Sequence, residues 1–183
     1  MQFKMLFGLT LMAATLAPVA FSSCSDEAEN QQVLVDRSGV YEEKNLISVA
    51  GLSLGTVPSQ KVTLAKEANG TYTVTLGSFH HPITTEIAPY AFVKSDPMII
   101  KHVQASTNKD GLTSLKGKVQ TTVSMTLQPR KGPEVSPKEY TVAEGTVIGT
   151  IDKNGKLGLS VSFKPGSMPM PLIYVFTPAE KLQ

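Results

Sequence analysis

Residues 62–76 read VTLAKEANGTYTVTL, and the pattern of this stretch decides the fold. On both sides of Asn69-Gly70, apolar residues alternate with Thr, which indicates strands that bury one face. Gly and Asn accept a positive backbone φ at little cost, and an Asn-Gly pair between two alternating runs is typical of a tight turn. The sequence therefore predicts a β-hairpin centred on Asn69-Gly70.

The same arrangement occurs twice more, at Asn108-Lys109-Asp110-Gly111 and at Asp152-Lys153-Asn154-Gly155. In the strands that follow these turns, the apolar residues fall on one face, and Thr, Ser, Lys and Gln fall on the other. Three hairpins closed by Gly predict a meander of antiparallel strands. The segments that the two further turns separate are 99–105 from 112–127, and 142–151 from 157–163.

Residues 37–177 have room for eight such strands with their turns, which is enough to close a small barrel. A closed barrel is favoured over an open sheet because closure removes the unpaired edges of a sheet rich in Thr and Val. No segment of this span shows the 3.6-residue apolar period of a helix. The sequence predicts an all-β domain, a single antiparallel eight-stranded barrel, followed by a tail at 178–183.

The N-terminal residues predict export. Lys4 supplies a positive charge, and an almost uninterrupted apolar run extends from Met5 to Phe21, so we interpret residues 1–23 as a signal peptide. The alternative is an uncleaved anchor, for which the run is at the lower edge of the necessary length. No intrachain disulfide can form, because Cys24 is the only cysteine.

Ser22-Ser23-Cys24 resembles the lipobox of bacterial lipoproteins, which implies cleavage before Cys24 and acylation of that residue. The alternative is a buried free cysteine. Residues 24–36 are interpreted as the lipidated cysteine and an acidic tether, and the run 25–32 resembles the surface-export signal of Bacteroides-group lipoproteins. A solvated linker explains that run equally well. The resemblance implies an outer membrane lipoprotein that is exposed at the cell surface.

Five segments share a common order of turns and alternating strands: Ser38-Gly39-Val40-Tyr41, Lys61-Val62-Thr63-Leu64, Gly70 to Leu76, Gly145 to Ile151, and Leu157 to Phe163. Together they resemble the calycin-like, lipocalin-related β-barrel domain of Bacteroides-group lipoproteins. The resemblance implies a lipid-anchored barrel, and Tyr41 stands where lipocalins carry a Trp.

Composition and motifs argue against catalysis, metal binding and nucleic-acid binding. Seventeen Lys and Arg against fifteen Asp and Glu give a net charge of +2, which is too balanced for a nucleic-acid footprint. The sequence has three histidines and no Gly-x-Ser-x-Gly elbow. His80 and His81 are adjacent, so on a strand they point to opposite faces, and we expect surface or loop histidines rather than a metal site. We expect no enzyme activity and no cofactor.

The most apolar piece after the signal peptide runs from Met168 to Phe176. One interpretation is a last strand that closes the barrel, with its outer face covered by residues 83–92. The other is a mouth or surface that accepts an apolar guest or partner. The residues expected on that surface are Tyr90, Phe92, Met168, Met170 and Tyr174.

These predictions combine into one functional hypothesis. The protein is expected to be a non-enzymatic binding module of the cell envelope, anchored through Cys24, for an apolar small molecule or an envelope protein. The alternative is a structural or interaction protein with a filled barrel and no small-molecule ligand. The sequence leaves both open, because the same apolar positions either fill the interior of a barrel or line a cavity within it.

Overall fold

The computed structural model of the chain describes residues 35–49, 52–84, 86 and 89–183. These residues form strands and turns and no α-helix. In this part of the chain there is accordingly no helix that could cross a membrane. The predicted signal peptide, Cys24 and residues 25–34 of the tether lie outside the described residues. The strands are β1 (Gly39–Val49), β2 (Leu52–Lys66), β3 (Tyr72–Leu76), β4 (Phe79–Pro82), β5 (Tyr90–Ser95), β6 (Met98–Thr107), β7 (Thr113–Lys118), β8 (Thr121–Pro129), β9 (Lys138–Ile151), β10 (Leu157–Pro165) and β11 (Leu172–Ala179).

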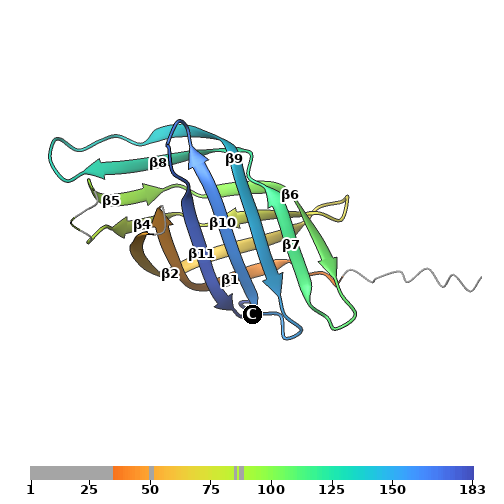
Figure 1. Cartoon of the computed structure of the whole chain (residues 1–183). Helices are drawn as coiled ribbons and strands as arrows, with labels where there is room; N and C mark the ends of the chain where they lie inside the picture. Colours follow the sequence, from red (N-terminus) through yellow and green to blue (C-terminus); the bar gives the residue numbers. More distant parts are fainter. Residues whose placement is uncertain (1–34, 50–51, 85, 87–88) are drawn as a thin grey trace, which may run out of the picture. The chain divides into compact units, whose positions relative to one another are not determined.

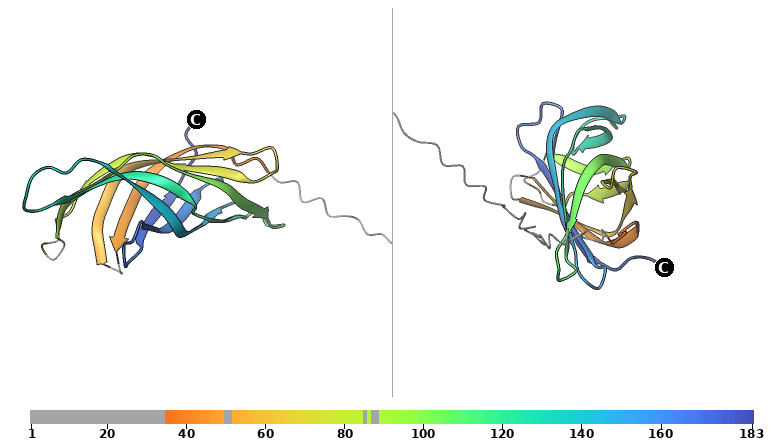
Figure 2. Two further views of the ribbon diagram at one scale, coloured as in Figure 1. Left: turned by 90° about the horizontal axis from the view of Figure 1, so that it is seen from above. Right: turned by 90° about the vertical axis from the view of Figure 1, so that its right-hand side faces the viewer.

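The sheet closes on itself. Its order is β10-β11-β1-β2-β3-β6-β7-β9-β8-β5-β4, and a further pairing joins β9 to β10, so the strands from β10 through β9 form a ring (Figure 1). All pairings are antiparallel. Two further views in Figure 2 show how the sheet curves round into the barrel. This confirms the predicted all-β antiparallel barrel.

Strands β4, β5 and β8 are continuations of ring strands. β3 leads into β4 after Gly77-Ser78, β5 leads into β6 after Asp96-Pro97, and β7 leads into β8 after Val119-Gln120. β4 pairs with β5, and β5 pairs with β8. These three strands therefore lengthen the barrel wall on the side of β3, β6 and β7 (Figure 1). Counted with their continuations, the described strands make eight long strands, the number that the sequence predicts.

The three predicted hairpin turns are confirmed. Gly70, Gly111 and Gly155 have φ angles of 84°, 81° and 86°, in the region that favours glycine. The turns join β2 to β3, β6 to β7, and β9 to β10. They lie at the end of the barrel where the described chain begins, since the Arg37 guanidinium donates a hydrogen bond to the Gly111 carbonyl.

Two tyrosines close this end of the barrel. Tyr41 and Tyr72 are buried, and the Tyr41 hydroxyl donates a hydrogen bond to the Arg37 carbonyl at 3.0 Å. The Tyr72 hydroxyl accepts a hydrogen bond from the backbone N–H of Arg37 at 2.9 Å. Tyr41, which stands where lipocalins carry a Trp, therefore closes this end of the barrel together with Tyr72 and the backbone of Arg37.

Alternate side chains of the last strand, β11, point into the barrel. Leu172, Tyr174 and Phe176 are buried, whereas Val175 is exposed on the outer face. β11 pairs with both β1 and β10, so it closes the barrel as one of the two interpretations predicts. The expected cover of its outer face by residues 83–92 is wrong at Val175, which is exposed. The strand continues to Ala179, two residues past the predicted end of the domain.

Candidate functional site

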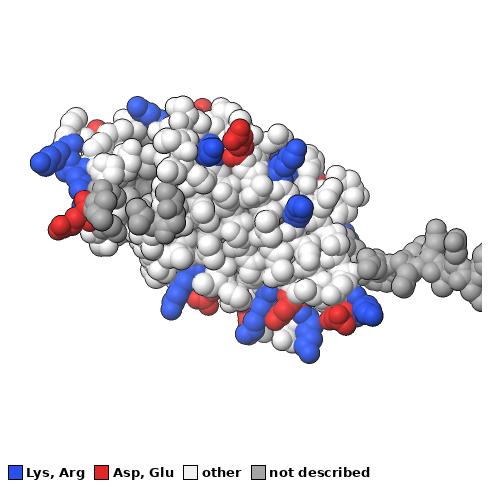
Figure 3. All heavy atoms as spheres, viewed as in Figure 1, with Lys and Arg blue, Asp and Glu red and all other residues white. Residues whose placement is uncertain are grey.

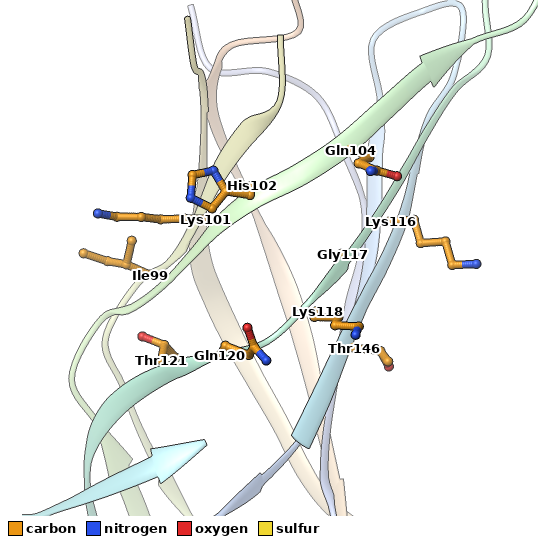
Figure 4. A pocket seen from close by; sticks show the side chains of 10 residues that line it. All are labelled: Ile99, Lys101, His102, Gln104, Lys116, Gly117, Lys118, Gln120, Thr121 and Thr146. Atoms are coloured by element: carbon orange, nitrogen blue, oxygen red, sulfur yellow. The ribbon is translucent and has the colours of Figure 1, made fainter. Parts of the chain in front are cut away.

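An open groove of about 970 Å³ lies on the outer wall of the barrel, where β6 and the β7–β8 strand part from each other. Figure 4 shows lining side chains from both of these strands and from β9. This volume is in the range of small-molecule sites. The lining residues are Ile99, Lys101, His102 and Gln104 on one side, Lys116, Gly117, Lys118, Gln120 and Thr121 on the other, and Thr146 of β9.

The groove exists because two neighbouring strands are paired only at their ends. β5 pairs with β8 as far as Ser95 and Met125, and β6 pairs with β7 only from Gln104 and Lys116 onward. Between these points, the described strands show no ladder pairing with each other. The wall is therefore opened at residues 97–103 and 117–123.

A bulge at His102 turns β6 at this position. His102 has a φ angle of 59°, and among the described residues it is the single non-glycine residue with positive φ. The pairing of β3 with β6 shifts register here, between the pairs Tyr72–Val103 and Val74–Ile100. A bulge of this kind bends a strand and interrupts its ladder, so it accounts for the departure of β6 from β7.

The carboxylate of Glu67, in the β2–β3 turn, holds this bulge in place. It accepts hydrogen bonds from the backbone N–H of His102 at 3.0 Å and from the hydroxyls of Thr71 and Thr73 at 2.7 and 2.8 Å. It also lies 2.8 Å from Nδ1 of His102. The His102 amide, followed by the two hydroxyls, lowers the pKa of Glu67 to about 2.

The groove is basic. Lys101, Lys116 and Lys118 line it, and its described lining contains no Asp or Glu. Within the part of the chain that the structure describes, none of these three lysines forms an ion pair. Lys101 and Lys116 lie on opposite sides of the groove and their side chains point away from each other (Figure 4), so their charges are not focused at one point.

The face formed by β9, β10 and β11 differs from this groove. Figure 3 shows that charged side chains are sparse over the centre of this face and gather toward its edges. Ile148 and Val175 are exposed on it, and the outward neighbours Ser160 and Ser162 are small and polar. A set of lysines without an ion-pair partner therefore distinguishes the groove from this face of the barrel.

The five residues expected on one apolar surface are not together. Tyr174 is buried, 3% exposed, with its ring 5.1 Å from that of Phe79, so its placement on an outer surface is wrong. Phe92 faces outward and its ring lies 4.7 Å from that of His80, whereas Tyr90 packs against the core. The aromatic residues of the set thus lie on different sides of the barrel wall, with Phe92 outside and Tyr174 inside.

Met168 and Met170 belong to the loop between β10 and β11. Met168 is half-buried and Met170 is 50% exposed. The loop lies beside the start of β9, since the Gly166 amide donates a hydrogen bond to the Thr141 carbonyl. These two methionines are accessible, but Tyr174 of the same segment points the other way.

The histidines differ from the expectation in one respect. His80 is exposed, but His81 is 6% exposed and its Nε2 lies 2.9 Å from the Leu54 carbonyl oxygen. The expectation that both would lie on the surface or in loops is wrong, because β4 alternates its side chains and turns the second one inward. In the described residues, no three His, Cys, Asp or Glu side chains gather as a metal site would need.

Sequence reasoning missed the groove. The alternation in β7 does place Lys116 and Lys118 on the outer face, and this was visible as Lys positions facing away from the core. That they line one groove with Lys101 depends on the register between β6 and β7 and on the bulge at His102. No local pattern in the sequence encodes either feature.

A family model decides the classification of the chain. The model of the calycin-like β-barrel domain matches residues 38–178. The chain belongs to this calycin-like family. The resemblance of the turn and strand segments is thereby confirmed, and the match covers every strand of the calycin-like barrel described above except the last residue of β11.

One solved structure is similar to this calycin-like barrel. It is the crystal structure of a Bacteroides fragilis protein described as an outer membrane protein, with a TM-score of 0.53 and 19% sequence identity. The similarity covers 79% of this chain and 50% of that one, so this chain matches about half the length of the Bacteroides protein. At this identity the similarity is one of fold. A comparison with curated proteins finds no match.

Proposed function

We propose that this calycin-like protein is a non-enzymatic binding module of the cell envelope that holds an extended anionic partner on its outer wall. The observation that carries the proposal is the groove between β6 and β7–β8. Three lysines line it and, in the described structure, no carboxylate pairs with them. Of the guests that the sequence leaves open, this groove favours an envelope partner over an apolar small molecule.

The interior of the barrel supports a role for the outer wall. Tyr41 and Tyr72 occupy the interior at one end. Further along, the Tyr174 ring lies 5.1 Å from the ring of Phe79 and 6.5 Å from that of Phe163. Rings from β4, β10 and β11 thus meet inside the barrel, which favours the filled-barrel alternative for this part of the interior.

The chemistry of the groove fits a chain of negative groups. Ammonium groups on opposite sides can each bind one anionic group, and the side chains of Gln104, Gln120 and Thr121 offer hydrogen bonds between them. Ile99 is 47% exposed and adds apolar contact area. A phosphorylated or carboxylated glycan of the envelope has this combination of spaced charges and hydroxyl groups.

The envelope location is part of the proposal. Its support is the predicted signal peptide, the lipobox-like sequence at Cys24, and the similarity of fold to a protein described as an outer membrane protein. Acylation of Cys24 would tether the barrel to the membrane through the acidic segment that follows it. The barrel would then sample the charged glycans near that surface.

The test is binding of the full-length protein to immobilised dextran sulfate, with uncharged dextran as the reference surface. Three exposed ion pairs of about 0.5 kcal/mol each predict about a tenfold loss of affinity when the groove lysines are replaced by Gln. Binding should also weaken as salt is raised. The groove variant is Lys101→Gln with Lys116→Gln and Lys118→Gln, and its matched control is Lys109→Gln with Lys131→Gln and Lys138→Gln.

The control variant removes the same charge from exposed positions outside the groove. If both variants lose affinity equally, the binding follows net charge and the groove is not the site. Absence of any difference between dextran sulfate and dextran for the unaltered protein would contradict the anionic partner itself.

A further inference from the structure

Three polar side chains of the barrel interior carry atoms that have no hydrogen-bond partner among the described residues. The atoms are both amide atoms of Asn45, Oε1 of Gln60 and the hydroxyl of Tyr174. Asn45 and Gln60 are at most 1% exposed. Buried polar groups in native proteins are nearly always paired, with protein, water or a ligand, so four such atoms in one region need an explanation.

The three residues are neighbours on the inner wall. Asn45 of β1 is opposite Phe176, and Ile47 is opposite Tyr174, so Tyr174 of β11 is a diagonal neighbour of Asn45. On the other side, Asn45 is opposite Val57 of β2 and Glu43 is opposite Gln60. Asn45 thus lies between the other two: Tyr174 is its diagonal neighbour, about 7–8 Å away in a regular sheet, and Gln60 follows on the other side across the bulge between Glu43 and Asn45.

The orientation of each side chain leaves its free atoms available. Nε2 of Gln60 donates a hydrogen bond to the Gly77 carbonyl at 2.7 Å, which fixes the amide and leaves Oε1 as an acceptor. The Tyr174 ring is held beside the rings of Phe79 and Phe163. Burial raises the pKa of Tyr174 well above its usual range, so its hydroxyl stays protonated and can both donate and accept.

We propose that the barrel interior binds a hydroxyl group between Asn45, Gln60 and Tyr174, from an ordered water molecule or from a small organic alcohol. The Gln60 oxygen needs a donor, and the Asn45 amide needs both a donor and an acceptor. A hydroxyl supplies both roles in one group, and buried water with about three polar partners is common in proteins. This site is separate from the outer groove and does not rest on the proposed function.

The test compares the urea midpoints of single variants of the full-length protein. Tyr174→Phe removes only the hydroxyl. If a guest pairs with that hydroxyl, the midpoint falls, and if the hydroxyl is unpaired, the midpoint rises because a buried polar group has been removed. Tyr72→Phe, which removes a hydroxyl that the Arg37 amide uses, is the reference for a lost hydrogen bond.

Asn45→Leu provides a second measurement of the same kind, with a fall expected and a rise overturning the proposal. The source of the hydroxyl is then identified directly. Native mass spectrometry of the unaltered protein that shows an added organic mass, absent from Tyr174→Phe, identifies a small alcohol. The bare protein mass together with ordered density between the three side chains in a crystal identifies water. Raised midpoints in both variants, or a crystal in which no density joins these side chains, would overturn the proposal.

Discussion

The carboxylate of Glu67 lies 3.0 Å from the backbone nitrogen of His102, a residue 35 positions further along the chain. This contact joins the first predicted hairpin turn to the bulge that separates β6 from β7. The carboxylate pairs with a backbone amide that the bulge would otherwise leave without a ladder partner. A single acidic side chain in a turn thereby shapes the basic groove on the outer wall.

The first prediction is a loss of stability in acid that depends on Glu67. Its pKa is lowered from 4.5 to about 2 in the folded protein. A depressed carboxyl pKa contributes stability above the unfolded value, and this contribution is lost as pH falls from 4.5 toward 2. The urea midpoints of the unaltered protein and of Glu67→Gln should therefore differ more at about pH 5 than at about pH 2.5. A difference that stays constant would contradict the role of this carboxylate.

The second prediction concerns the backbone of His102. Its φ of 59° disfavours any residue with a Cβ, by about 1 kcal/mol. Both His102→Gly and His102→Ala lose the imidazole, so their comparison isolates the backbone. We expect the Gly variant to be more stable than the Ala variant by about 1 kcal/mol in urea unfolding. In an ordinary strand position the order is reversed, and that result would show that the bulge is not formed in solution.

The third prediction concerns the closed end of the barrel. Tyr72→Phe removes the hydroxyl that accepts the Arg37 amide at 2.9 Å and leaves that amide without this partner. The expected loss in the free energy of unfolding is about 1–2 kcal/mol. Tyr140→Phe serves as the control, because Tyr140 is half-buried and no hydrogen bond of its hydroxyl is seen in the described structure. Equal effects of the two substitutions would mean that the Arg37 contact does not stabilise the fold.

The fourth prediction is the lipid anchor. Mass spectrometry of the membrane fraction should show a mature N-terminus at Cys24 that carries acyl chains. Cys24→Ala removes the residue to be acylated and should prevent this processing. If another peptidase then removes the signal peptide, the protein should leave the membrane fraction. A mature chain that begins at another residue, or that has an unmodified thiol at Cys24, would contradict the lipoprotein hypothesis.

Local sequence patterns determined the barrel. Gly70, Gly111 and Gly155 each sit where a tight turn requires positive φ, and the alternating residues beside them turn one face to the core. Turn geometry and side-chain alternation depend on residues within a few positions of each other, so the sequence alone was sufficient to predict eight antiparallel strands. The inward-facing residues of β10 follow from the same rule.

Only the tertiary structure decided which residues meet. Tyr174 and Phe92 were expected on one surface, but closure of the barrel places the first inside and the second outside. Lys101 and Lys118 line one groove because their strands are unpaired beside the bulge at His102, where Glu67 binds the backbone. Such contacts depend on strand register and on hydrogen bonds between residues far apart in the chain, and short-range alternation carries no information about either.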